Sequence, residues 1–126
     1  MTSVLLDSDI LIEVSRLRNR EILGAWERLR DSDAVLMCSP VTIAEIWHGA
    51  RLQEHGILDA LFSIMVVFPV DVTVGRRAGE YLRRYSASHG VELGDALIAA
   101  TARLSGASLW TRNRKHYPMR DIEFYS

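Results

Sequence analysis

The sequence has little of what stabilises secreted proteins. Its 126 residues include one cysteine, Cys38, so no internal disulfide can form. Cys38 ends the apolar run Ala34–Cys38, and free cysteines are among the most buried residues, so we expect it to fill the core. A single thiol gives no reason to expect an oxidising compartment.

Long hydrophobic runs and a basic amino-terminal flank are also missing. No apolar stretch approaches the roughly 20 residues that cross a bilayer, and Asp7 and Asp9 interrupt the first one. The pattern is not that of a signal peptide. We therefore expect a cytoplasmic protein that makes no membrane contact.

The chain has no large excess of charge of either sign. A formal net charge of −1 argues against a surface that holds nucleic acid by bulk charge alone. The basic residues nevertheless form two clusters: Arg16, Arg18, Arg20, Arg28 and Arg30, and then Arg112, Arg114, Lys115 and Arg120. Each cluster has two interpretations, a track for a phosphate backbone or a solvated helix face.

Only three prolines interrupt the chain, and no repeat, linker or low-complexity segment divides it. Short apolar runs predict strands at residues 3–6, 34–38, 66–70, 108–110 and 122–125. Helical spacing of apolar residues predicts helices around 10–17, 22–29, 40–50, 58–65, 72–89 and 93–104, with Asn19, Ser39 and Asp71 as N-caps. Strands separated by helices require crossover connections. We therefore predict a single domain over residues 1–126, an α/β fold with three α/β/α layers and a mostly parallel central sheet.

Four polar residues fall where this fold would gather them. Asp7 follows the first strand directly, Glu45 lies in the helix after the second strand, and Asp95 begins the last long helix. Asn113 comes shortly after the strand that ends at Trp110. All four lie on connections that leave the carboxyl ends of strands, where open α/β sheets place their sites.

Carboxylates gathered at one edge repel one another unless a cation lies between them. Hard oxygen ligands suit Mg²⁺ or Mn²⁺, and such ions can activate water and neutralise a leaving oxygen in phosphodiester hydrolysis. The sequence offers no Walker loop, zinc-ligand spacing or Ser-His-Asp arrangement as a competitor. Metal-assisted phosphodiester hydrolysis is the chemistry that fits.

Each carboxylate also has a purely structural interpretation. Asp7 could cap the first helix, and Asp95 could be a favourable acid in the first turn of its helix. Glu45 is harder to explain structurally, because carboxylates in apolar surroundings are rarely buried unpaired. Asp9 could support the metal ligands or act as a cap, whereas Asp71 is interpreted as a cap.

Four segments together resemble the motifs of PIN-domain proteins: Leu5–Leu11, Ser39–Gly49, Gly94–Ala102 and Thr111–Asn113. They occur in the right order over nearly the whole chain, and the VapC toxin branch of bacterial toxin–antitoxin systems is the most similar. The resemblance implies a PIN-like fold and an endoribonuclease that cuts single-stranded or looped RNA with Mg²⁺ or Mn²⁺. It also implies a homodimer and a cognate antitoxin that covers the active groove.

The resemblance also assigns roles to individual residues. Asp7 and Asp95 would be the central metal ligands, and Glu45 would bind metal or position the attacking water. Asn113 stands where many PIN domains have aspartate, so this catalytic site has one negative charge fewer and a tightly held second metal is in doubt. Asp9 and Thr111 are candidates for holding the ligands in place.

Three other interpretations remain. Asp7-Ser8-Asp9 resembles the paired aspartates of haloacid-dehalogenase-type phosphatases, but those enzymes need a mid-chain lysine and the only lysine here is Lys115. Glu45 and His48 have the Glu-x-x-His spacing of di-iron bundles, which require two copies. The third alternative is a catalytically silent PIN-like module that only binds RNA or protein.

Overall fold

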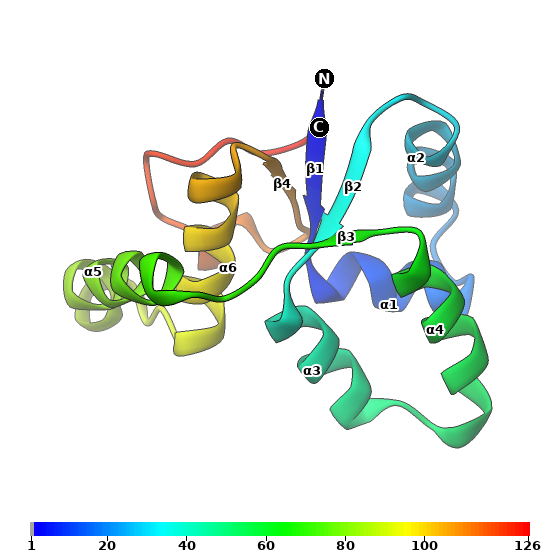
Figure 1. The fold of residues 1–126 in the computed structure, drawn as a ribbon, viewed down its shortest axis with the longest axis horizontal. Coiled ribbons are helices and arrows are strands. Elements are labelled where there is room, and N and C mark those ends of the chain that lie inside the picture. The colour runs from blue at the N-terminus through cyan, green and yellow to red at the C-terminus, as the bar shows by residue number, and fades with distance from the viewer. Residues whose placement is uncertain (1) are drawn as a thin grey trace.

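The computed structural model describes residues 2–126, which form a four-stranded parallel sheet in the order β3-β2-β1-β4. The strands are β1 (Ser3–Leu6), β2 (Val35–Cys38), β3 (Val66–Val67) and β4 (Ser108–Trp110). Leu5 is in register with Met37 of β2 on one side and with Leu109 of β4 on the other. The first strand of the chain therefore occupies the interior of the sheet (Figure 1).

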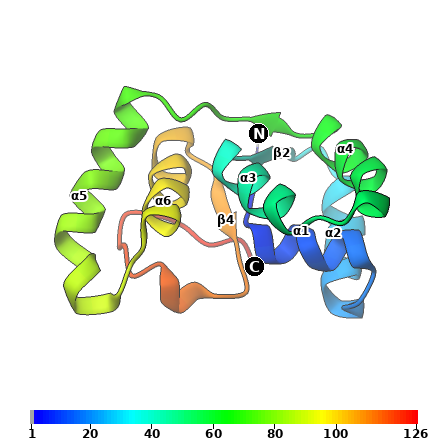
Figure 2. The same ribbon diagram turned by 90° about the horizontal axis from the view of Figure 1, so that it is seen from below.

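The helices lie on both faces of this sheet, as Figures 1 and 2 show. Their bounds are α1 (Ser8–Arg16), α2 (Arg20–Arg30), α3 (Pro40–Gly49), α4 (His55–Ser63), α5 (Val72–His89) and α6 (Leu93–Ser105). Two short 3-10 helices, η1 (Leu52–Glu54) and η2 (Arg114–His116), lie in the connections. Helices α5 and α6 cover one face, while α1, α2 and α4 cover the other.

Alternation along β1 explains the two cores. Leu5 faces the cluster formed with α5 and α6, whereas Val4 and Leu6 face the cluster formed with α1, α2 and α4. Side chains of successive strand residues point to opposite faces, so a strand that is apolar throughout must be covered on both sides. The predicted three-layer α/β/α fold with a parallel sheet is confirmed.

The predicted caps are also confirmed. Asn19 Oδ1 accepts a hydrogen bond from the Ile22 amide at 3.0 Å. Ser39 Oγ accepts one from Val41 at 3.1 Å. Asp71 Oδ1 accepts one from Val74 at 3.0 Å. Each bond satisfies an amide that the first turn of a helix leaves without an intrahelical acceptor.

Two strand predictions were too long. The strand predicted at 66–70 ends after Val67. Phe68 still donates to Cys38 at 3.0 Å, but its partner strand β2 ends at Cys38 and the chain turns into α3 at Pro40, so the ladder has no further partner. The strand predicted at 122–125 is reduced to one parallel bridge between Leu109 and Phe124. The short strand β4 pairs with this segment only through the amide and carbonyl of Leu109.

The prediction that Leu17 continues the apolar stripe of α1 was wrong. The helix ends at Arg16, and Leu17 adopts a left-handed backbone with φ 54° and a side chain that is 75% exposed. Its amide donates to Val14, so the residue closes the helix in the position that glycine usually takes.

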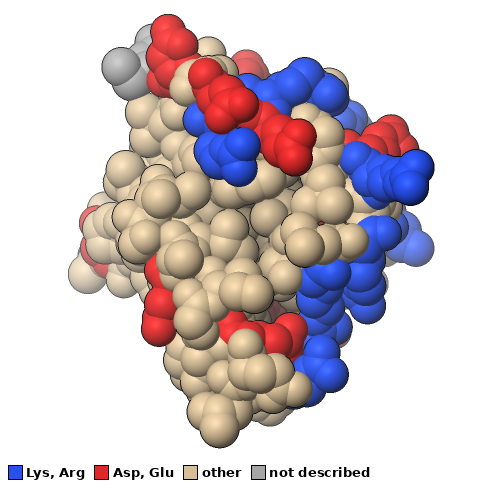
Figure 3. Space-filling view, turned by 90° about the vertical axis from the view of Figure 1, so that its right-hand side faces the viewer, with Lys and Arg blue, Asp and Glu red and all other residues tan. Residues whose placement is uncertain are grey.

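Both basic clusters are exposed, and they meet at Glu13, which pairs with Arg18 of the first cluster and Arg112 of the second. The arginines of α1 and α2 are exposed, and Arg16 and Arg18 pair with Glu54 and Glu13. Figure 3 shows the side of the molecule that carries α2 and α4, with a band of Lys and Arg side chains along one edge.

Within residues 2–126 no helix has both the length and the apolar character needed to cross a membrane.

One buried hydroxyl gives a stability prediction. Thr42 in α3 is fully buried, and its Oγ1 has no hydrogen-bond partner among residues 2–126. Replacing this hydroxyl by a methyl group in Thr42→Val should raise the free energy of unfolding by about 1 kcal/mol, because a buried unpaired polar group is destabilising. Urea denaturation measures the change.

Thr101→Val is the matched control. Thr101 is equally buried on a helix, but its hydroxyl donates to the Leu97 carbonyl at 2.8 Å. The control should therefore not gain stability, since the substitution removes a satisfied hydrogen bond. Equal stabilisation of both variants would contradict the explanation.

Candidate active site

A pocket of about 320 Å³ opens at the carboxyl edge of the sheet, between α1, α3, α6 and the segment that follows β4. Its wall includes five of the residues predicted from the sequence: Asp7, Asp9, Glu45, Asp95 and Asn113. The sixth, Thr111, lies behind Asp7 and donates to it. The connections from β1 and β4 run in different directions here, and ligands of parallel α/β sheets bind at such a point.

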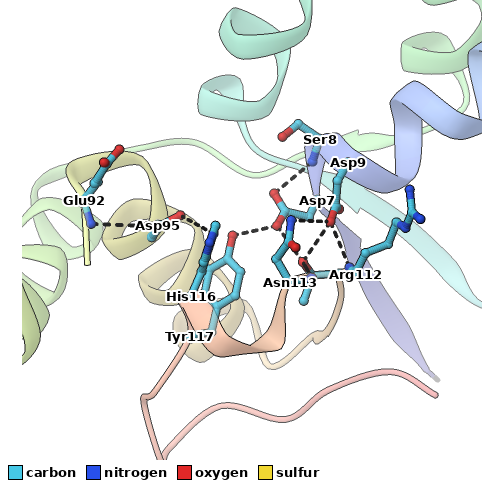
Figure 4. A network of polar contacts seen from close by, with 10 residues as sticks. Asp7, Ser8, Asp9, Glu92, Asp95, Arg112, Asn113, His116 and Tyr117 are labelled. Atoms are coloured by element: carbon cyan, nitrogen blue, oxygen red, sulfur yellow. Dashed lines mark hydrogen bonds and ion pairs between the residues drawn. The ribbon is translucent and has the colours of Figure 1, made fainter. Parts of the chain in front are cut away.

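Asp7 is held by three donors at the point where β1 becomes α1 (Figure 4). Its Oδ1 accepts from the Ser8 amide at 2.8 Å, and its Oδ2 accepts from the Thr111 hydroxyl at 2.9 Å and the Tyr117 hydroxyl at 2.7 Å. The residue is also the N-cap of α1. Asp7 therefore caps α1 and lines the pocket at the same time.

Asp9 ties α1 to the turn after β4. Its Oδ2 accepts from the Arg112 amide at 2.9 Å and from the Asn113 side-chain amide at 3.1 Å (Figure 4). Its Oδ1 is buried and has no partner in the part of the chain that the structure describes. Burial and the neighbouring Asp7 charge raise the pKa of Asp9.

Asp95 lies in the first turn of α6. Its Oδ2 accepts from the Glu92 amide at 3.2 Å, so the predicted role of a first-turn acid is real. Its Oδ1 lies 4.0 Å from Nδ1 of His116 (Figure 4). Burial raises the pKa of Asp95, although the Glu92 hydrogen bond acts in the opposite direction.

The apolar neighbours of Glu45 in the sequence suggested that it is buried in apolar surroundings, but it is not. The residue lies on an exposed part of α3, and the adjacent Trp47 is 40% exposed and stacks on His55. The carboxylate nevertheless faces the pocket, where a Cβ at Gly94 would lie 3.6 Å from its Oε2. Loss of water in this recess raises the pKa of Glu45, and the charges of Asp7 and Asp95 add to the effect.

The donor set of the pocket suits a hard divalent cation. Its carboxylate oxygens are the ligands that Mg²⁺ and Mn²⁺ prefer, and the buried Oδ1 of Asp9 is one oxygen that no protein donor satisfies. Within residues 2–126, however, no three His, Cys, Asp or Glu side chains converge tightly enough to form a finished metal site. Burial and the neighbouring charges of Asp7 and Asp95 raise the pKa of Glu45, and a cation among these groups would offset the repulsion. The chemistry of the residues therefore fits a divalent ion.

Sequence reasoning missed Tyr117, His116 and Ser8 as members of the site. All three line the pocket, but none falls in a carboxylate pattern. Tyr117 is buried, and its hydroxyl is the closest side-chain donor to Asp7. The only sequence signal was a tyrosine a few residues beyond the fourth motif, a position where nothing distinguishes an ordinary core aromatic from a donor.

The comparison with protein families defines the class. The family model described as PIN domain matches residues 4–122. The chain therefore belongs to the PIN-domain family.

Curated relatives narrow the class further. The chain is 38% identical to ribonuclease VapC10 of Mycobacterium tuberculosis over 117 residues, which cover 92% of this chain and 86% of the relative. It is 34% identical to ribonuclease VapC19 of the same organism over 113 residues, 88% of this chain and 90% of that one. The resemblance to the VapC branch is thus confirmed.

A solved structure supports the fold independently. The VapBC2 structure from Rickettsia felis, bound to a DNA fragment from its promoter, contains a chain that superposes with a TM-score of 0.82 and covers 98% of both chains. At 20% sequence identity, the likeness concerns the fold alone.

Proposed function

We propose that this protein is a divalent-metal-dependent endoribonuclease and the toxin of a toxin–antitoxin pair. The observation that carries the proposal is the pocket at the carboxyl edge of the sheet, where Asp7, Glu45 and Asp95 share one wall. The relatives named ribonucleases support RNA as the substrate. We take residues 1–126 as one nuclease domain.

Asp7, Asp95 and Glu45 are the residues that would hold Mg²⁺ or Mn²⁺. When bound, the ion supplies an activated water and neutralises the charge that develops on the leaving oxygen. Three donors fix Asp7 in one orientation. This preorganisation is what a reaction that depends on positioning requires.

Glu45 faces the other carboxylates of the pocket. In the protein without metal, partial burial and the charges of Asp7 and Asp95 raise its pKa, and a bound cation would offset that repulsion. We assign Glu45 to metal binding or to positioning the attacking water. Asn113 contributes a neutral amide, which braces Asp9 in the structure.

The surroundings of the pocket suit an RNA strand. Exposed Arg112, Arg114 and Lys115 follow β4 directly, next to the turn that holds Asp9. Basic side chains at this place can contact phosphates on either side of the cleaved bond. No arginine or lysine of either basic cluster lines the pocket itself, but Asn113 and His116 do. We assign the phosphate-contacting role to the second basic cluster, because its residues flank these two in the chain.

The family also supports partners for this chain. We propose a cognate antitoxin, because the similar Rickettsia felis chain comes from a VapBC2 structure. We further propose a homodimer in the cytoplasm. Analytical ultracentrifugation of the protein, with and without the antitoxin encoded by the neighbouring gene, measures both the homodimer and the complex.

Incubation of the purified protein with a defined single-stranded RNA tests the function. We expect internal cleavage in Mn²⁺ or Mg²⁺, no cleavage in excess chelator, and recovery when the ion is added back. A simple phosphomonoester should remain intact, which separates this activity from that of a phosphatase. Metal binding without any RNA cleavage over a panel of RNAs would leave a silent binding module as the better description.

A further inference from the structure

The carboxylate of Asp7 accepts hydrogen bonds on both of its oxygens, whereas the bonds to Asp9 all reach Oδ2. Asp7 Oδ2 accepts two hydroxyl donors, Thr111 at 2.9 Å and Tyr117 at 2.7 Å. Its Oδ1 accepts one amide donor, Ser8 at 2.8 Å. By contrast, Asp95 accepts one backbone hydrogen bond, from the Glu92 amide, and its Oδ1 lies 4.0 Å from Nδ1 of His116.

Counting lone pairs shows what remains available on Asp7. A carboxylate has about four lone-pair sites, two on each oxygen. The two hydroxyls occupy both sites of Oδ2, and the Ser8 amide occupies one site of Oδ1. One site remains, on Oδ1.

We propose that Tyr117 is a positioning residue that acts through Asp7. Its hydroxyl and that of Thr111 occupy both lone-pair sites of Asp7 Oδ2. A cation can therefore bind Asp7 only through the remaining lone pair on Oδ1, which points in one fixed direction. The inference rests on the metal site proposed above and deepens it. It excludes chelation of the ion by both oxygens of Asp7.

The setting of Tyr117 matches this role. The residue is buried, and its ring belongs to the core cluster beneath α5 and α6, so the ring cannot move without disturbing the core. Only the hydroxyl reaches the site (Figure 4). A tyrosine hydroxyl has one proton, and Asp7 Oδ2 is its acceptor at 2.7 Å.

Thr111 alone cannot fix the same oxygen. Its hydroxyl has a single proton and lies near two carboxylates, 2.9 Å from Asp7 Oδ2 and 3.4 Å from Asp9 Oδ2. Loss of the tyrosine hydroxyl would therefore free one site on Asp7 Oδ2 and let the carboxylate turn. Partners that orient a metal ligand in this way typically contribute 10–100-fold to metal affinity.

Tyr117→Phe removes the hydroxyl and leaves the ring in the core. Calorimetric titration with Mn²⁺ in the absence of RNA should show affinity about tenfold or more below that of the wild-type protein. With RNA present, kcat should fall while KM stays within about twofold, since an interaction with the reacting site and not with the strand has been lost. Thr111→Val, which removes the other donor to Oδ2, should weaken Mn²⁺ binding in the same direction and serves if Tyr117→Phe does not fold.

Tyr81→Phe is the matched control. Tyr81 is also buried, and its hydroxyl donates to Asp121 Oδ1 at 2.8 Å, but neither residue lines this pocket. Its Mn²⁺ affinity should equal that of the wild-type protein. Wild-type affinity in folded Tyr117→Phe, or an equal loss in Tyr81→Phe, would overturn the role of Tyr117 alone. A wild-type protein that binds no Mn²⁺ would instead overturn the proposed metal-dependent function, and this inference with it.

Discussion

Asp95→Asn should reduce RNA cleavage by about a thousandfold or more while the protein stays folded. Asp95 shares the pocket with Asp7 and Glu45, and the amide oxygen of asparagine can still accept from Glu92. What is lost is one negative charge toward the ion. Stabilisation of reaction charge by a bound metal amounts to several kcal/mol, which corresponds to about three powers of ten in rate.

The same substitution should stabilise the metal-free protein at neutral pH. Burial raises the pKa of Asp95 above its ordinary 3.8, so the folded state binds the proton more tightly than the unfolded state. Stability from this group is therefore present below pH 3.8 and is lost as pH rises through the raised pKa. Thermal unfolding should show a higher Tm for Asp95→Asn at pH 7 and no such gain near pH 3.

Asp71→Asn is the control for both measurements. Asp71 also accepts one backbone amide at the start of a helix, but it lies outside the pocket, and asparagine is an equally good N-cap. Cleavage by this variant should match the wild-type rate. Undiminished cleavage by a folded Asp95→Asn protein would remove Asp95 from the mechanism.

Asn113→Asp should make the protein depend on metal for its stability. The Asn113 side-chain amide now donates to Asp9 Oδ2 at 3.1 Å. An aspartate there would replace this donor by a second carboxylate facing the first. We expect the metal-free variant to lose about 1–3 kcal/mol of unfolding free energy, because a hydrogen bond to a charged group becomes a repulsion.

Mn²⁺ should more than reverse this loss. Two ions in a nuclease site lie roughly 3.5–4 Å apart and need ligand charge to offset their repulsion. Asp7, Glu45 and Asp95 supply three negative charges, which neutralise one divalent ion but not two. We therefore expect one Mn²⁺ in the wild-type protein without RNA, and a second or a tightened weak site in Asn113→Asp, both measured by calorimetry.

Asn19→Asp adds the same single charge at a distance from the pocket. Asn19 caps α2, where aspartate serves equally well, so Mn²⁺ binding by this control should be unchanged. Two equally tight ions in the wild-type protein would mean that the charge count omits a ligand, and the unpartnered Oδ1 of Asp9 is the first candidate. An Asn113→Asp protein with unaltered stability and metal binding would show that residue 113 faces neither Asp9 nor the ions in solution.

The sequence predicts the layers of this fold well, because its apolar pattern is strong and its caps are chemically explicit. The edge of the sheet where the carboxylates meet follows from the parallel order alone. Predictions were wrong where the end of an element depends on its surroundings. Strand β3 ends early because its partner β2 gives way to α3, and Leu17 leaves α1 in a left-handed conformation.

The finer structure of the site could not be read from the sequence, since it depends on which side chains meet across the fold. Apolar neighbours suggested that Glu45 is buried, but Trp47 beside it is itself partly exposed. Tyr117 looks like any core aromatic until its hydroxyl is placed against Asp7. The sequence made Asp9 a candidate for a supporting role or a cap, whereas its bonds to Arg112 and Asn113 emerge only from the structure.

The position of β1 between β2 and β4 sets the order in which the protein becomes active as it is made. Asp7 is synthesised early, yet its two hydroxyl partners stand 104 and 110 residues later in the chain. Until β4 and the segment after it dock, one edge of β1 is unpaired and Asp7 retains only the Ser8 amide. A nascent or truncated chain that ends before Thr111 would thus carry most of the fold without a working site, so that the ability to cut RNA appears only with the last part of the molecule.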